Sequence, residues 1–275
     1  MTLATRNHFI RIATLTVLVF VLLTLAAFIL ILVRNEDIPA LAQARTIGFL
    51  SDFILTPYSP MAAIAAITLF PLLSFIGLIY ILFAFEKTQT TEITFFAACV
   101  FIVALEGVRI LIPVYSGWMT AGFYISAISR VVLFCRLFTT LCLLSSIIFT
   151  TGQTSQQIGP SIFLMAFFSF SLVNVVPFNS ANLSTSFFII PGYSQMIFLF
   201  MGVLGLLSSV SYLVQGKLRN AKEYTRAAGG ILLILIGYSL LSFCDSWLFF
   251  ASGTILLIQG TWLYLKQIHR YYLWQ

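Results

Sequence analysis

Residues 15–33 read LTVLVFVLLTLAAFILILV, an apolar run without a single charged side chain. A helix needs about 20 such residues to cross the hydrocarbon core of a bilayer. The strands of a transmembrane barrel alternate between apolar and polar residues, and neither this run nor Ile231–Leu241 does so. Since backbone groups in lipid must be satisfied internally, a helix is the structure that remains. The stretch therefore predicts a membrane-spanning helix.

The same kind of run recurs along the chain, in blocks separated by short polar stretches. Of the 275 residues, 60% are hydrophobic and 8% are charged, against about 25% charged residues in an average soluble domain. We therefore predict an all-α fold, a polytopic transmembrane helix bundle that forms one integral membrane domain over residues 1–275. The expected eight spans are about 10–33, 61–85, 93–113, 121–148, 160–178, 193–214, 228–244 and 247–265.

The basic residues predict the orientation of these spans, because Lys and Arg concentrate in cytoplasmic loops. With both termini inside, only Arg34 and Arg45 fall on the outer side, and three of the 14 basic residues lie within spans. The remaining nine, all on the inner side, are Arg6, Arg11, Lys87, Lys217, Arg219, Lys222, Arg226, Lys266 and Arg270. We expect a multi-pass protein of the bacterial inner (plasma) membrane with both termini in the cytoplasm.

The first span also has features of a signal peptide. Basic residues precede its apolar run, and Ala42-Gln43-Ala44 resembles a cleavage site. The run is longer than the usual ~7–15 residues, however, and charged residues intervene before that site. We expect an uncleaved span, and cleavage would leave seven spans.

Four further segments, three loops and the C-terminal tail, carry their own expectations. Residues 34–60 form either a short helix in the outer interface or an ordinary connector. The basic segment 215–227 is either a topology determinant only or a docking surface for a cytoplasmic protein. The aromatic and basic tail, 262–275, is expected to anchor in the headgroup layer. The loop 179–191 is uncharged and turn-rich, and it should face outward.

Four charged residues lie where the bilayer should be: Glu106, Arg109, Arg130 and Arg136. A charge in hydrocarbon is costly and requires partners, water or a ligand. Glu106 and Arg109 are three residues apart on one helical face and can pair. Arg130, on the next span, lies at a depth that allows contact with Glu106. Arg136 follows six residues later, which leaves the two arginines about 120° apart around the helix axis.

Three arginines against one glutamate leave an excess of positive charge that arginine cannot lose by deprotonation. One hypothesis is that these four residues line an outward-facing cavity that binds an anion, such as a carboxylate or a lipid phosphate. The alternative is purely structural: the arginines bond to Glu106, carbonyls and hydroxyls and hold the bundle together. Polar residues that could join such a cavity are Asn174, Ser194, Gln195, Tyr238, Ser239, Ser242 and Gln259.

Several classes of function are disfavoured. The two histidines, His8 and His269, lie outside the spans, which argues against a Ser–His hydrolase or a histidine metal site. The four cysteines lie singly in apolar segments and imply neither a disulfide nor a metal. No cofactor is expected. The net charge of +6 is divided among loops and spans, so nucleic acid is not an expected partner.

These observations favour a sensing or binding membrane subunit for an anionic small molecule or lipid group. Its span count is similar to that of multi-pass sensor regions in bacterial signalling proteins, without a shared motif. A transporter or permease subunit for an anionic or lipidic substrate is the alternative, although no internal repeat is visible. A lipid-modifying enzyme is the third reading, and the shortage of His and Asp disfavours catalysis.

Overall fold

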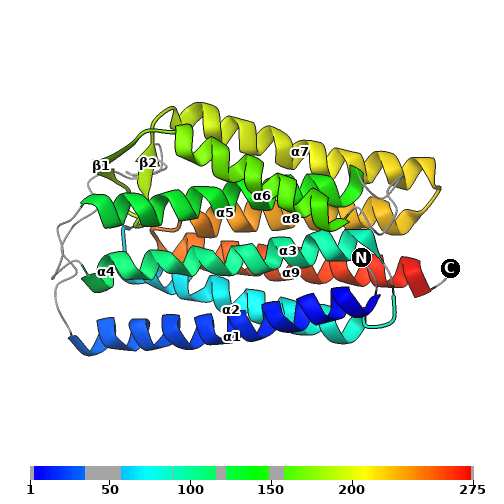
Figure 1. Ribbon diagram of the computed structural model, residues 1–275, viewed down its shortest axis with the longest axis horizontal. Coiled ribbons are helices and arrows are strands. Elements are labelled where there is room, and N and C mark those ends of the chain that lie inside the picture. The colour runs from blue at the N-terminus through cyan, green and yellow to red at the C-terminus, as the bar shows by residue number, and fades with distance from the viewer. Residues whose placement is uncertain (1–2, 35–56, 89, 116–121, 149–157, 274–275) are drawn as a thin grey trace.

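As predicted, the computed structural model is an all-α helical bundle (Figure 1). It also holds one small β-hairpin, which was not predicted. The structure describes residues 3–34, 57–88, 90–115, 122–148 and 158–273. Among these, eight helical stretches are long and apolar enough to cross a membrane. The expected interfacial helix of residues 34–60 and the site at Ala42-Gln43-Ala44 fall largely or wholly outside the described residues.

The helices follow the chain order of the predicted spans. Their bounds are α1 (Leu3–Arg34), α2 (Pro60–Ala84), α3 (Thr91–Ala104), α5 (Gly122–Ile148), α6 (Ile158–Val175), α7 (Ser194–Leu218), α8 (Lys222–Ser242) and α9 (Trp247–Leu273). Span three continues beyond α3 through a 3₁₀ helix, η2 (Leu105–Ile110), and a short helix, α4 (Leu111–Tyr115).

Three helices extend six or more residues beyond the predicted spans. The first is α1, which begins at Leu3 and not at residue 10. Helix α8 begins at Lys222, six residues before the predicted start, because the basic segment 222–227 is itself helical. Helix α9 continues to Leu273, so the tail extends the last helix. Tyr264, Leu265 and Ile268 of that tail are buried against the rest of the bundle. The location of the tail in the headgroup layer stays a prediction.

Both described ends of the chain lie at the same end of the bundle (Figure 1). Arg6 of α1 donates a hydrogen bond to the carbonyl of Phe85, which follows α2, at 2.6 Å. Tyr272 of α9 donates to Glu92 of α3 at 2.8 Å. The basic connection between α7 and α8 lies at this end too. This arrangement is what an even number of spans requires.

The opposite end of the bundle carries a two-stranded antiparallel sheet, β1 (Phe178–Leu183) and β2 (Ile189–Pro191). These strands lie in the segment 179–191 and the residue before it, which was predicted to be a turn-rich outward loop. The residues between the strands, from Ser184 to Phe188, are buried. The positive φ of Phe187, 55°, turns the chain there. The hairpin therefore inserts into the bundle end and does not extend away from it.

Helices α8 and α9 pack closely through glycines. A Cβ atom on Gly237 would lie 2.5 Å from the backbone nitrogen of Leu257, and one on Gly260 would lie 2.7 Å from that of Ile234. Only glycine permits backbones to approach so closely. A Cβ on Gly230 or Gly205 would also lie within 3.1 Å of a neighbouring helix, whereas a Cβ on Gly202 or Gly229 meets nothing within 4 Å.

Large apolar side chains cover the outside of the bundle. Val33 on α1, Phe163 on α6 and Leu218 on α7 are 77%, 72% and 75% exposed. Such a surface is unfavourable in water and suits lipid. Together with the length of the helices, it indicates a multi-pass membrane protein.

Candidate functional site

Glu106 and Arg109 lie in a 3₁₀ turn inside span three. The tighter turn occurs where Gly107 meets helices α1 and α2. A Cβ on Gly107 would lie 2.6 Å from Cγ of Pro71 and 3.0 Å from a ring carbon of Phe20. A 3₁₀ stretch within a helix often marks a functional position. The local sequence thus places a charged pair at an irregular point of the bundle interior.

The Glu106 carboxylate is fully buried and has three partners. Oε2 forms an ion pair with Nη2 of Arg109 at 2.9 Å. Oε1 accepts hydrogen bonds from Nε of Arg136 at 3.2 Å and from the Tyr238 hydroxyl at 2.8 Å. Three helical segments, η2, α5 and α8, meet at this one side chain. A buried carboxylate with charged and neutral donors is well compensated for the loss of water.

Both arginines also bond to one backbone oxygen. Arg109 Nη1 and Arg136 Nη2 each donate to the carbonyl of Ser242 at 2.9 Å. Ser242 is the last residue of α8, and the final carbonyls of a helix carry partial negative charge and lack partners within the helix. The C-terminal end of α8 therefore compensates part of the positive charge of Arg109 and Arg136 that the Glu106 carboxylate leaves unbalanced.

The hairpin closes the cluster from the end of the bundle. The Ser186 carbonyl accepts a hydrogen bond from Arg109 Nη1 at 3.3 Å. The guanidinium carbon of Arg136 lies 4.4 Å from the ring centroid of Phe188 and 4.6 Å from that of Phe243. Cation–π contacts of this kind stabilise a desolvated arginine. Arg136 is thereby held between two aromatic rings.

The cluster of Glu106, Arg109 and Arg136 is nevertheless balanced neither in charge nor in hydrogen bonds. Two guanidinium groups meet one carboxylate, so the three charged side chains in contact carry one excess positive charge. Within the part of the chain that the structure describes, Arg136 Nη1 has no hydrogen-bond partner although it is buried. A buried charged donor without a partner costs more than an ordinary missing hydrogen bond.

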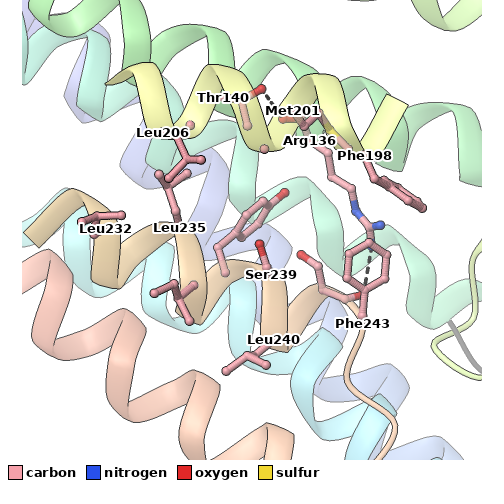
Figure 2. A pocket seen from close by; sticks show the side chains of 15 residues that line it. Arg136, Thr140, Phe198, Met201, Leu206, Leu232, Leu235, Ser239, Leu240 and Phe243 are labelled. Carbon is pink, nitrogen blue, oxygen red and sulfur yellow. Dashed lines mark hydrogen bonds between the residues drawn. The ribbon is translucent and has the colours of Figure 1, made fainter. Parts of the chain in front are cut away.

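A cavity of about 370 Å³ adjoins Arg136 and lies between α5, α7 and α8 (Figure 2). Its lining is mainly apolar. It comprises Arg136, Thr140, Phe198, Met201, Gly202, Gly205, Leu206, Leu232, Leu235, Ile236, Tyr238, Ser239, Leu240, Ser242 and Phe243. Figure 2 shows Arg136 and Phe243 at one end of this cavity and Leu232 at the other.

Arg130 lies apart from the other three predicted site residues. Its Nη1 is 3.5 Å from Oδ1 of Asn174 on α6, and its guanidinium lies 5.6 Å from the ring centroid of Phe178. The expected contact with Glu106 is therefore made by Arg136 and not by Arg130. The 120° between the two arginines explains this, since only one of them can point into the bundle toward span three.

Some of the other polar residues that were expected at the cavity lie at the cluster or the cavity, and others lie on the outside of the bundle. Tyr238 and Ser242 belong to the cluster, and Ser239 lines the cavity. Gln195 and Gln259 are exposed on the outside of the bundle. The roles of the Ser242 carbonyl and of Phe188 were not predicted. A backbone carbonyl has no side-chain signature, and nothing in the sequence near 188 indicates an arginine contact.

A second buried carboxylate lies at the end of the bundle that holds the termini. Glu92, fully buried in the first turn of α3, accepts hydrogen bonds from the hydroxyls of Tyr224 at 2.5 Å and Tyr272 at 2.8 Å. Nearby, the Tyr212 and Tyr264 hydroxyls lie 2.8 Å apart. This group joins α3, α7, α8 and α9. The sequence placed Glu92 at the edge of a loop and gave no signal for it.

The four cysteines are free and buried. Among the described residues, no group of three His, Cys, Asp or Glu side chains is placed to hold a metal ion.

Comparison with known proteins gives one similar sequence. A protein of Treponema pallidum (strain Nichols), described as an uncharacterized protein, is 24% identical over an alignment of 351 positions that covers 100% of both chains. No protein-family model matches the chain. No solved structure matches it either.

Proposed function

We propose that this protein is a membrane-embedded binding subunit, and that Arg136 receives the anionic group of a ligand from the adjoining cavity. One observation carries the proposal: a buried guanidinium with an unpartnered Nη1, as far as the described residues extend, lines an open cavity. An anion there would supply the missing acceptor and neutralise the excess positive charge. Guanidinium suits this role because it stays charged and binds oxyanions with fixed geometry.

The position of the cavity supports a sensing role. Two of its walls are α7 and α8, and these helices are joined by the basic segment 215–227. A ligand that changes how α7 lies against α8 would alter the presentation of Lys217, Arg219, Lys222 and Arg226. We propose this segment as the docking surface for a partner protein. The concentration of Lys and Arg at that end supports a cytoplasmic location for it and for both termini, in a plasma membrane.

Binding of charged and neutral amphiphiles tests the proposal. Full-length protein in lipid nanodiscs would be titrated with dodecanoate, dodecyl phosphate and dodecanol, with thermal stability as the readout. Because a ligand that binds the folded state stabilises it, at least one of the two anions is expected to raise the melting temperature while dodecanol does not.

Two variants connect this effect to Arg136. Arg136→Gln should abolish the stabilisation by the anions, and it leaves the Glu106–Arg109 pair balanced in charge. Arg136→Lys, the matched control, keeps the charge and should retain part of the effect. Equal stabilisation by dodecanol, or by the anions in Arg136→Gln, would contradict an anion site at this arginine.

A further inference from the structure

Two unpartnered donors, and not one, adjoin the cavity. Besides Arg136 Nη1, the Ser242 hydroxyl is buried and lacks a hydrogen-bond partner among the described residues. Both residues line the cavity, and they are close, since Arg136 Nη2 lies 2.9 Å from the Ser242 carbonyl. A cationic N–H donor and a neutral O–H donor match the two oxygens of one carboxylate. A phosphate would present more oxygens than these two donors can satisfy.

Beyond these donors, the cavity continues as an apolar groove along α8. Ser242 and Leu232 are ten residues apart on this helix, which corresponds to about 15 Å at ~1.5 Å per residue. That is roughly half of the ~30 Å hydrocarbon thickness, the depth of one leaflet. Figure 2 shows the groove following Leu240, Ser239 and Leu235 toward Leu232, with Phe198, Met201 and Leu206 of α7 opposite.

The groove opens toward the outside of the bundle. Leu206 and Ile236, on its two walls, are 58% and 48% exposed, and the surface there is the apolar one that faces lipid. Its volume of about 370 Å³ is at the lower end of the ~300–1,000 Å³ typical of ligand pockets. A slender chain fits such a space, and a ligand in the bilayer can reach it without leaving the membrane.

We infer that the ligand is a long-chain monocarboxylate of the fatty-acid class, which enters sideways from the membrane. Its carboxylate lies at Arg136 and Ser242, and its alkyl chain lies in the groove between α7 and α8. This inference rests on the proposed function, because it assigns the ligand of the same arginine. The inference adds three points to the proposed function: the anionic group is a carboxylate, the ligand needs an alkyl chain, and the ligand enters from the membrane.

Gly202 offers a way to fill the groove without disturbing the fold. It lines the groove, and a Cβ added there meets nothing within 4 Å. Gly202→Leu should therefore occupy the space of the alkyl chain. Gly229→Leu is the matched control, because Gly229 also has open space around an added Cβ but is not among the groove residues. Ser242→Ala removes one of the two carboxylate donors.

Binding would be measured with full-length protein in nanodiscs, using dodecanoate, dodecyl phosphate and acetate as probes. We expect dodecanoate to bind at least about tenfold more tightly than the other two. Gly202→Leu and Ser242→Ala should each weaken dodecanoate binding by about tenfold or more, which is the size expected for the loss of chain burial or of a charge-assisted hydrogen bond. Gly229→Leu should bind as the original protein does.

The outcomes separate the two proposals. If dodecyl phosphate binds at Arg136 but dodecanoate does not, the carboxylate assignment is overturned and the anion site stands. If acetate binds as tightly as dodecanoate, or if Gly202→Leu has no effect, the chain does not lie in the groove. If no anion binds in an Arg136-dependent manner, the proposed function itself fails.

Discussion

Arg109 and Arg136 donate to the same carbonyl oxygen, that of Ser242, at 2.9 Å each. Two like charges are thus brought to one point, with Glu106 in contact with both. Such a geometry is stable only because a carboxylate and the C-terminal end of α8 lie between them. The stability of the bundle and the proposed anion site consequently depend on the same few atoms.

Glu106→Gln should strongly destabilise the protein. Without the carboxylate, two guanidinium groups remain buried with only carbonyls and rings as partners, and breaking a buried ion pair in this way costs about 3–5 kcal/mol of unfolding free energy. Reversible unfolding in mixed micelles would measure the loss. Glu86→Gln is the control, because Glu86 forms an exposed ion pair with Arg11 at 3.7 Å, and such pairs contribute less than about 1 kcal/mol. Similar losses in both variants would contradict the account of the cluster.

Glu92→Gln should weaken the opposite end of the bundle without changing ligand binding. The carboxylate accepts from Tyr224 and Tyr272, and an amide would replace a charged acceptor with one neutral oxygen and a donor. A loss of about 1–3 kcal/mol is expected. The unfolding free energy and the affinity for dodecanoate would be measured together, with Glu223→Gln as the control. The prediction is contradicted if Glu92→Gln changes the affinity for dodecanoate but leaves the unfolding free energy unchanged. Glu92 would then influence the cavity directly, and not through the stability of the bundle.

Gly237→Ala should separate α8 from α9. The added methyl group would lie 2.5 Å from the backbone nitrogen of Leu257, so the helices must move apart, at a cost of about 1–3 kcal/mol. Gly229→Ala adds the same atom on the same helix where nothing lies within 4 Å, and it should be neutral or slightly stabilising because alanine favours helix. The difference between their melting temperatures is the test, and equal values would refute close packing at Gly237.

Cys244, in the turn between α8 and α9, should react slowly with thiol reagents. Burial raises the pKa of its thiol to about 12, whereas a free cysteine has a pKa of about 8.5. The thiolate fraction at pH 8 is then on the order of 10⁻⁴, so maleimide labelling should be roughly 10³-fold slower than at Lys222→Cys, an exposed control. Because the folded-state pKa is raised, the rate should increase with pH up to about 12. Peptide mass spectrometry would identify the labelled site, and fast labelling at pH 8 would contradict the burial.

The sequence was informative about the spans and about three of the buried charges, those of Glu106, Arg109 and Arg136, for physical reasons. Length, hydropathy and the rarity of charge determine where helices cross a membrane, so the eight helices follow the expected order. The pairing of Glu106 with Arg109 followed from their spacing. The choice between Arg130 and Arg136 did not, because it depends on how far α5 is rotated about its axis. That rotation is set by packing against α3 and α7, which one sequence does not reveal.

Other parts of the candidate site have no sequence signal at all. The Ser242 carbonyl acts as an acceptor because α8 ends there, and the predicted end of this span was two residues later. Phe188 reaches Arg136 only because the hairpin inserts into the bundle. Glu92 precedes the predicted span 93–113 by one residue, and no pattern in the sequence marks it as buried. These contacts join segments far apart in the chain, and they arise from tertiary packing.

Helix α7 is held unevenly along its length. Near its C-terminal end, the Ser209 hydroxyl bonds to the carbonyl of Ala228 at 3.1 Å and the Tyr212 hydroxyl lies 2.8 Å from those of Ser146 and Tyr264. Its other half, from Phe198 to Leu206, is a wall of the cavity. If α7 moves as a rigid rod about these hydrogen bonds, it acts as a lever with its pivot near Ser209 and Tyr212. An occupant that pushes the long arm away from α8 would swing the short arm, and the basic segment attached to it, in the opposite direction and over a smaller distance.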